Sequence, residues 1–142
     1  MRNLLVPFLA VAVLGLATAA RSQCSVVPGT GCPGQGAPVC GTPPVIGTNF
    51  IVRCAPSCFP SIAQTILIGV PSSTPFVFPF PPACTPGCVV ACLPVAVISG
   101  PGVTLAIPNN PSLIGLTLCM QCACQSLTGC INITQMMLFT IM

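Results

Sequence analysis

The residues best suited to chemistry in this chain are its cysteines. Four of them stand within the twelve positions of the stretch CMQCACQSLTGC, at Cys119, Cys122, Cys124 and Cys130. Cysteines spaced this closely can hold a metal ion, carry out thiol–disulfide exchange or form structural disulfides. The choice depends on the other residues of the chain and on the secondary structure that carries the sulfurs.

All twelve cysteines follow residue 23, where they make up roughly a tenth of the remaining chain, a density typical of secreted disulfide scaffolds. The number is even, so full pairing is open to them. Their connectivity does not follow from the sequence, because twelve cysteines allow on the order of ten thousand complete pairings. We predict up to six disulfides, formed by Cys24, Cys32, Cys40, Cys54, Cys58, Cys84, Cys88, Cys92, Cys119, Cys122, Cys124 and Cys130.

A thiolate metal site is the alternative, because C-x3-C spacings occur at 54/58, 84/88 and 88/92 in addition to CMQC. A thiolate cluster accumulates negative charge, however, and the chain has no lysine to offset it. A reactive C-x-x-C needs a cation or a helix N-terminus to lower a thiol pKa, and CMQC shows neither. Structural disulfides are therefore favoured, and we expect no metal and no cofactor.

The first 22 residues are predicted to be a signal peptide. Arg2 gives a positive start, an apolar stretch covers 4–16, and the small residues ATA stand at 17–19. Cleavage after Ala19 and cleavage after Ser22 both fit, and a retained membrane anchor is the alternative. Later apolar stretches are too short, or too interrupted by Pro and Gly, to span a bilayer. We expect a protein that is secreted or at the cell surface, with no membrane span after cleavage.

The charge inventory excludes most enzyme chemistry. The chain contains three arginines and no Asp, Glu, Lys or His, and Tyr and Trp are also absent. General acid–base catalysis uses such titratable side chains, and a hydroxyl nucleophile needs one of them as its base. We expect no enzyme and no small-molecule substrate. After cleavage only Arg53, or Arg21 and Arg53, remain, which is too little charge to attract nucleic acid.

Short apolar runs, separated by Pro/Gly turn signals, fill the chain from residue 45 onward. The chain contains 18 prolines and 13 glycines, which disfavours long helices. The runs are rich in Val, Ile, Thr and Phe, a pattern typical of an all-β sandwich or barrel. The expected strands cover 48–54, 62–70, 76–80, 88–98, 103–107, 114–125 and 131–141.

This pattern divides the chain into three parts. Residues 1–22 are the signal peptide, 23–44 form an irregular arm rich in Cys, Gly and Pro, and 45–142 form the β domain. The fold class we predict is all-β: a small, disulfide-rich β-sandwich or barrel-like domain that carries this arm at its N-terminus.

Alternation along two expected strands assigns their faces. In 114–125, Cys122 and Cys124 fall on one face, while Cys119 and Gln121 fall on the other. Cys122 and Cys124 then need different partners, which we expect on neighbouring strands. The last strand is expected to carry one apolar face, formed by Ile131, Ile133, Met137, Phe139 and Ile141.

Several short motifs lie within residues 44–142: PVIGTNF (44–50), IG (68–69), GC (87–88), IPNNPSLIGLTLCMQ (107–121) and FTI (139–141). In these motifs the chain resembles a domain often found at the C-terminal end of exported proteins of planctomycete-type bacteria. The resemblance implies a small β-sandwich-like accessory module of unknown activity, usually attached to a larger extracellular domain. The missing acidic residues and the many cysteines indicate a specialised, cross-linked form.

Export, high cysteine content and near-zero net charge favour a non-enzymatic structural or surface protein, because a nearly uncharged surface resists self-association poorly. We expect it to be disulfide-stapled and to self-assemble in an extracellular layer, filament or matrix. One alternative is an extracellular module that binds another protein through an exposed Phe or Pro edge, and a second is a thiolate metal-binding protein. Arg53 fits either a partner contact or an exposed strand-face residue.

Overall fold

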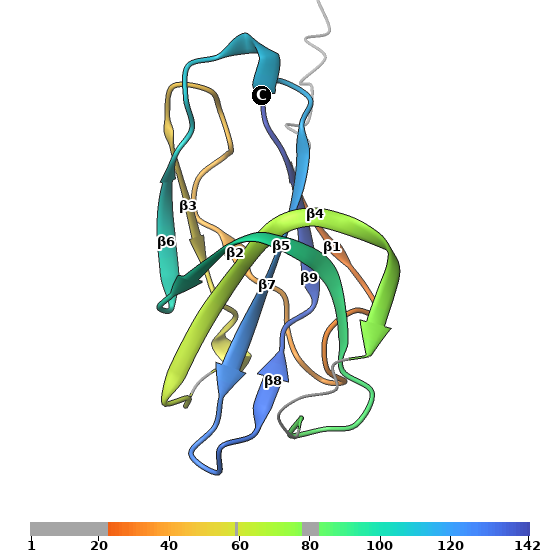
Figure 1. The fold of residues 1–142 in the computed structure, drawn as a ribbon. Helices are drawn as coiled ribbons and strands as arrows, with labels where there is room; N and C mark the ends of the chain where they lie inside the picture. The colour runs from red at the N-terminus through yellow and green to blue at the C-terminus, as the bar shows by residue number, and fades with distance from the viewer. Residues whose placement is uncertain (1–22, 59, 78–82) are drawn as a thin grey trace, which may run out of the picture.

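In a computed structural model of the chain, the described residues are 23–58, 60–77 and 83–142. They form a nearly all-β fold with two sheets (Figure 1), which confirms the predicted fold class. The predicted signal peptide lies outside the described residues, as do residues 78–80 of the expected strand 76–80.

The larger sheet, sheet A, has six antiparallel strands. Five follow one another in space in the order β1 (Cys24–Val27), β9 (Met136–Thr140), β7 (Thr117–Gln125), β4 (Ala63–Val77) and β5 (Val89–Ser99). The sixth, β8 (Ile131–Ile133), pairs with the end of β7. Sheet B contains β2 (Val39–Cys40), β3 (Asn49–Arg53) and β6 (Gly102–Ala106). Two 3-10 turns, η1 (Pro56–Cys58) and η2 (Pro111–Leu113), complete the described elements.

The main core lies between the two sheets. Along β3 the side chains alternate, so that Phe50 and Val52 are fully buried while Arg53 is exposed. The Phe50 ring lies 4.8 Å from the ring of Phe139 on β9, measured between centroids. Sheet A contributes the rest of this interface through a row of buried residues on its inner face: Ile66, Ile68, Met120, Cys122, Cys124, Met137 and Phe139.

The segment expected as an irregular arm is largely irregular but supplies two short strands. In β1, Cys24 lies opposite Phe139, which places the arm at one edge of sheet A. In β2, Val39 lies opposite Arg53, at one edge of sheet B. The Cys24–Cys40 disulfide joins these two edge strands across the sandwich.

The last expected strand, 131–141, is broken in two, and its predicted single face is wrong. Ile133 lies opposite Ala123 and Met137 lies opposite Met120. Met137 is four residues after Ile133, but their partners on β7 are only three residues apart, so the segment from β8 to β9 contains one extra residue. The extra residue reverses the facing of the side chains. Ile133 therefore packs on the side of β7 that points away from sheet B, whereas Met137 packs in the main core.

Strands β4 and β5 bend together and arch across the molecule (Figure 1). The bend coincides with a β-bulge: Ile68 lies opposite Ala96 and Gly69 opposite Pro94, which leaves Val95 as the extra residue. A side chain at Gly69 would meet the backbone carbonyl oxygen of Leu93, so glycine permits this close approach. Beyond the bend, the start of β5 covers the outer face of β7 and β9.

Candidate functional site

All twelve cysteines are paired in six intramolecular disulfides. Three of them connect sheet A with sheet B or with the segment that follows β3: Cys24–Cys40, Cys54–Cys122 and Cys58–Cys124. Two fix the covering layer outside β7: Cys32–Cys88 and Cys92–Cys119. The sixth, Cys84–Cys130, joins two loops. The layers on both sides of β7 are thus tied to it covalently: the segment after β3 through Cys122 and Cys124, and β5 through Cys119.

The predicted division of the β7 cysteines between two faces is confirmed. Cys122 and Cys124 point into the main core, where they pair with Cys54 and Cys58, while Cys119 pairs on the opposite side of the strand. The expectation of partners on neighbouring strands is wrong. Side chains stand perpendicular to a sheet, so these sulfurs reach the layer that faces them rather than the strands beside them.

Gln121 is a fully buried polar residue on the outer face of β7, and it ties the arch to that strand. Its Oε1 accepts hydrogen bonds from the backbone N–H groups of Ala91 (2.9 Å) and Cys92 (3.0 Å) on β5. Its Nε2 donates to the carbonyl oxygens of Val89 (3.1 Å) and Thr134 (3.0 Å). One side chain therefore satisfies four backbone groups in a layer where the strands do not pair directly.

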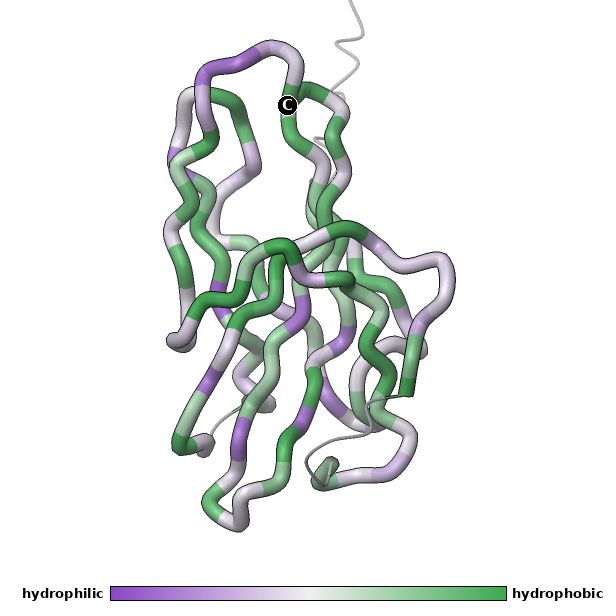
Figure 2. The backbone as a smooth tube through the Cα atoms, viewed as in Figure 1, coloured by the Kyte–Doolittle hydropathy of each residue, from purple (hydrophilic) through white to green (hydrophobic). Residues whose placement is uncertain are grey.

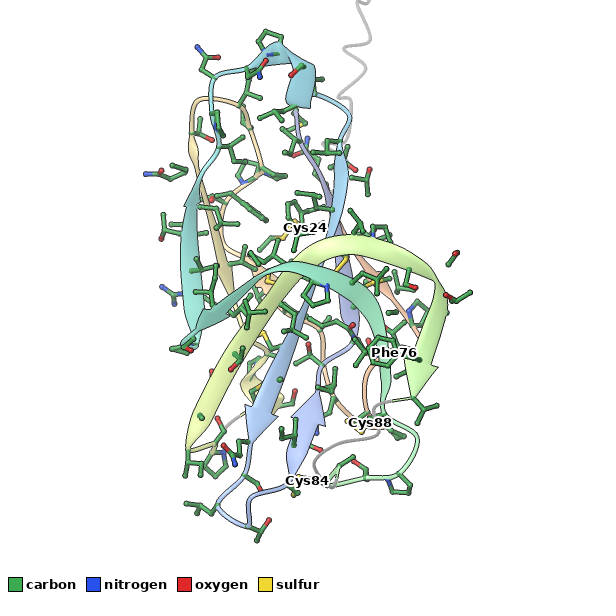
Figure 3. All side chains as sticks on the ribbon, in the orientation of Figure 1. Cys24, Phe76, Cys84 and Cys88 are labelled. Carbon is green, nitrogen blue, oxygen red and sulfur yellow. A yellow bond between two sulfur atoms is a disulfide. The ribbon has the colours of Figure 1, made fainter. Side chains whose placement is uncertain are left out.

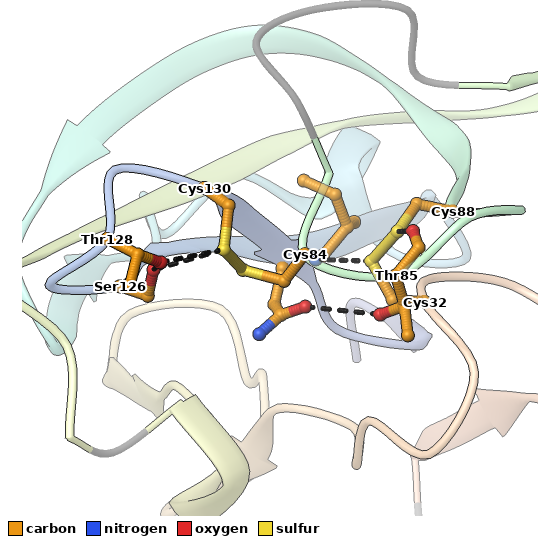
Figure 4. Close-up of a disulfide and its surroundings, with 9 residues drawn as sticks. Cys32, Cys84, Thr85, Cys88, Ser126, Thr128 and Cys130 are labelled. Carbon is orange, nitrogen blue, oxygen red and sulfur yellow. Dashed lines mark hydrogen bonds between the residues drawn. A yellow bond between two sulfur atoms is a disulfide. The ribbon is translucent and has the colours of Figure 1, made fainter.

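The loops at the end of the molecule are held by Cys84–Cys130 and Cys32–Cys88 (Figures 3 and 4). The hydroxyl of Ser126 lies 3.1 Å from the Cys130 sulfur and can donate to it. The backbone N–H of Ile133 donates to the Cys32 sulfur at 3.0 Å. These contacts place both disulfides beside β8, so that the turn after β7 and the segment before β5 are fixed together.

The six disulfides indicate an oxidising environment, because glutathione and thioredoxin keep cysteines reduced in the cytosol. Within 23–58, 60–77 and 83–142, no group of three or more His, Cys, Asp or Glu side chains is placed to hold a metal ion. Over the same ranges no helix has the length and apolarity needed to cross a membrane.

The arch carries exposed apolar side chains on both of its faces, because Leu67, opposite Val97, and Val70, opposite Leu93, are three steps apart on β4. Val70 and Leu93 lie opposite each other on β4 and β5, and both are more than two-fifths exposed. Val95 in the bulge is 75% exposed and Val97 is 62% exposed. We call these four residues the arch patch; Figure 2 shows the hydrophobic colouring of the strands that carry it. Phe76 and Val77 extend exposed apolar surface to the end of β4 (Figure 3).

Sequence reasoning identified the strand that carries this patch but not its exposure. The sequence predicts a strand over 88–98 and assigns no exposure to its residues. In the structure Val90 and Cys92 are buried, whereas every residue from Leu93 to Val97 is exposed. The available signal was the pair of bend-forming residues, Gly69 and Pro94, inside otherwise regular strands.

A hollow lies on the opposite side of the sandwich, on the outer face of sheet B. Its volume is about 700 Å³, and it is lined mainly by apolar residues of β2, β3 and β6 and by Pro56 and Pro101. Arg53 stands in its wall. It is the only charged side chain among the described residues.

The stability of the folded chain is expected to be nearly independent of pH. The sequence contains no Asp, Glu, His, Lys or Tyr, and its cysteines are paired, so no side chain changes charge near neutral pH. We expect the free energy of unfolding to change by less than about 1 kcal/mol between pH 3 and pH 9. Guanidinium unfolding of the oxidised protein at four pH values measures this, and a cooperative acid transition would contradict it.

No family model matches the chain, and the comparisons with curated proteins and with solved structures also returned no match.

Proposed function

We propose that the chain is an exported, non-enzymatic structural protein that self-associates in an extracellular layer, filament or matrix. The observation that carries this proposal is the arch patch, an exposed apolar surface on a domain with almost no charge. Exposed apolar side chains that gather in one region of a soluble monomer usually mark an interaction site. The six disulfides support an extracellular location and a durable building block.

The side-chain chemistry supports a role without catalysis. The disulfides leave no thiol, and the hydroxyl groups have no His, Asp, Glu or Lys to act as their base. A thiolate metal site would require reduced cysteines, and each cysteine here has a cysteine partner. What the chain offers to other molecules is therefore apolar surface, backbone groups and Arg53.

A second copy of the chain is the partner that fits the arch patch. Burying a charged group without a counter-charge is costly, and a typical protein surface brings many such groups. A second copy would bring its own arch patch, whose four residues carry no charge. Strand β5 is also an outer strand of sheet A, so its surface is open to another molecule. Pro94 lacks a backbone N–H, which favours contact through side chains over a continuous strand pairing.

Adding charge to the arch patch is expected to abolish self-association. In the V95K/V97K variant, each lysine would be desolvated in the interface, so the association constant should fall at least about 100-fold. Both positions are well exposed, so the monomer should fold normally. Sedimentation velocity of the oxidised protein over a range of concentrations measures the effect.

The matched control is L127K, which adds lysine at a residue that is 78% exposed in the turn between β7 and β8. This variant should associate like the wild type. A wild-type chain that stays monomeric at millimolar concentration would contradict self-association and favour the alternative, an extracellular module that binds a different protein. A clear loss of association in L127K would show that added charge, and not the arch patch, controls association.

A further inference from the structure

Arg53 occupies an unusual position for the single charged residue of the described chain. It lies at the end of β3, opposite Val39 of β2 and opposite Gly102 of β6. A Cβ atom at Gly102 would stand 3.1 Å from the Arg53 Cγ, so the glycine leaves the space in which the arginine stem lies. The side chain is thereby held along the wall of the hollow on sheet B.

The guanidinium group has no partner among the residues that the structure describes. It makes no hydrogen bond or ion pair with the residues the structure describes, and the sequence contains no Asp or Glu that could supply a carboxylate. Its five N–H donors are therefore available to a ligand. A planar guanidinium binds a carboxylate through two parallel hydrogen bonds, which is its preferred anionic partner together with phosphate.

The walls around Arg53 are apolar and rigid. Val39 and Ile51 flank the arginine on the sheet, and Pro56 and Pro101 close the hollow. The adjacent Cys54 is fixed by its disulfide to Cys122 and by a 2.8 Å hydrogen bond from its backbone N–H to the Pro101 carbonyl oxygen. A preformed site of this kind loses little conformational entropy when a ligand binds.

We infer that this hollow is a binding site for a small amphiphilic carboxylate, held by Arg53 at its charged end and by the apolar walls along its chain. A phosphate would use the guanidinium but not the surrounding apolar surface, and a neutral lipid would leave the guanidinium unpaired. The ligand is bound and not transformed, since the hydroxyl of Thr104 in the wall of the hollow has no base to activate it. The inference does not depend on self-association, because the arch patch belongs to sheet A and the hollow to sheet B.

The probe is octanoate below its micelle concentration, titrated into the ¹⁵N-labelled oxidised protein at a concentration where the chain is monomeric. We expect saturable NMR shift changes at the amides of Val39, Ile51, Arg53 and Thr104. Octanol should bind at least tenfold more weakly, and octyltrimethylammonium should not bind there. Equal binding of the three probes, shifts centred on Leu93–Val97, or no saturable shift would each overturn the inference.

Two variants separate the local guanidinium from net charge. R53Q should weaken octanoate binding at least tenfold while leaving the unfolding midpoint unchanged. R53Q/L127R restores the net charge at a distant turn and should bind as weakly as R53Q. Recovery of binding in the double variant would overturn the inference, because the effect would then be one of overall charge.

The pH dependence of octanoate binding provides an independent test of the contact with Arg53. No side chain of the protein titrates in this range, and the octanol control accounts for the chain termini, so the remaining pH dependence comes from the carboxylate of the probe. Octanoate affinity should fall as its carboxylate is protonated below about pH 5, whereas octanol affinity should stay constant. Octanoate that binds equally at pH 3 and pH 7 would show that the apolar walls alone hold it.

Discussion

Removing the Cys54–Cys122 and Cys58–Cys124 disulfides together is expected to lower the free energy of unfolding by about 1 kcal/mol more than the sum of the two single removals. The two bridges join nearly the same segments, with sequence separations of 68 and 66 residues. While one remains, the other closes a loop of only about eight residues, which contributes about 2.5 kcal/mol by the chain-entropy relation. When both are absent, the shortest remaining loop runs through Cys32–Cys88 and Cys92–Cys119 and has about thirty residues, so closing it contributes about 3.7 kcal/mol by the same relation.

The measurement is guanidinium unfolding of four proteins: the wild type, C54A/C122A, C58A/C124A and the quadruple variant. The matched control combines C54A/C122A with C84A/C130A. The remaining Cys58–Cys124 bridge keeps the loop closed by Cys84–Cys130 unchanged, so these two removals should be additive. Additive losses in the quadruple variant would contradict the pairing of β7 with Cys54 and Cys58.

The second large effect is expected at Gln121. The Q121L variant keeps an apolar side chain of similar size in the same layer but leaves the N–H groups of Ala91 and Cys92 and the carbonyl oxygen of Thr134 without their partner. The Val89 carbonyl oxygen still accepts from the backbone N–H of Gly31. Each buried backbone group left unpaired costs about 1 kcal/mol or more, so we expect a loss of roughly 3 kcal/mol in the free energy of unfolding. Amide exchange at Ala91 and Cys92 should accelerate at the same time, because the arch loses its attachment to β7.

The matched control is Q64L on the adjacent strand β4. The Gln64 side chain makes one hydrogen bond, in which its Nε2 donates to the hydroxyl of Ser61 at 2.8 Å. This substitution should cost less than about 1 kcal/mol. If Q121L and Q64L are equally stable, the four hydrogen bonds of Gln121 do not hold the arch in place.

The β fold and the facing of Cys119, Cys122 and Cys124 could be predicted from the sequence because both depend on local patterns. Alternation along one strand decides on which side a sulfur lies, whatever the strand packs against. The partners of these sulfurs could not be predicted, because they lie in layers that face β7 and are distant in sequence. The single face expected for 131–141 failed for a similar reason: one extra residue between β8 and β9 reverses it, and only pairing with β7 reveals that residue.

The functional surfaces were less accessible to sequence reasoning than the fold. Leu93–Val97 and Val90–Cys92 have the same apolar character, yet the bend at Gly69 exposes the first group and buries the second. Arg53 was an exposed strand residue with two open interpretations. The binding role that we propose for Arg53 depends on Gly102 and Pro101, which the pairing of β3 with β6 brings beside it.

The most direct test of a disulfide-locked extracellular building block is the intact mass of the exported protein after alkylation under denaturing conditions, with and without prior reduction. The structure predicts a monomer mass with no adduct before reduction and twelve adducts after it. Alkylation of several cysteines without reduction would contradict the six-disulfide framework and return the thiolate metal site as the hypothesis to pursue.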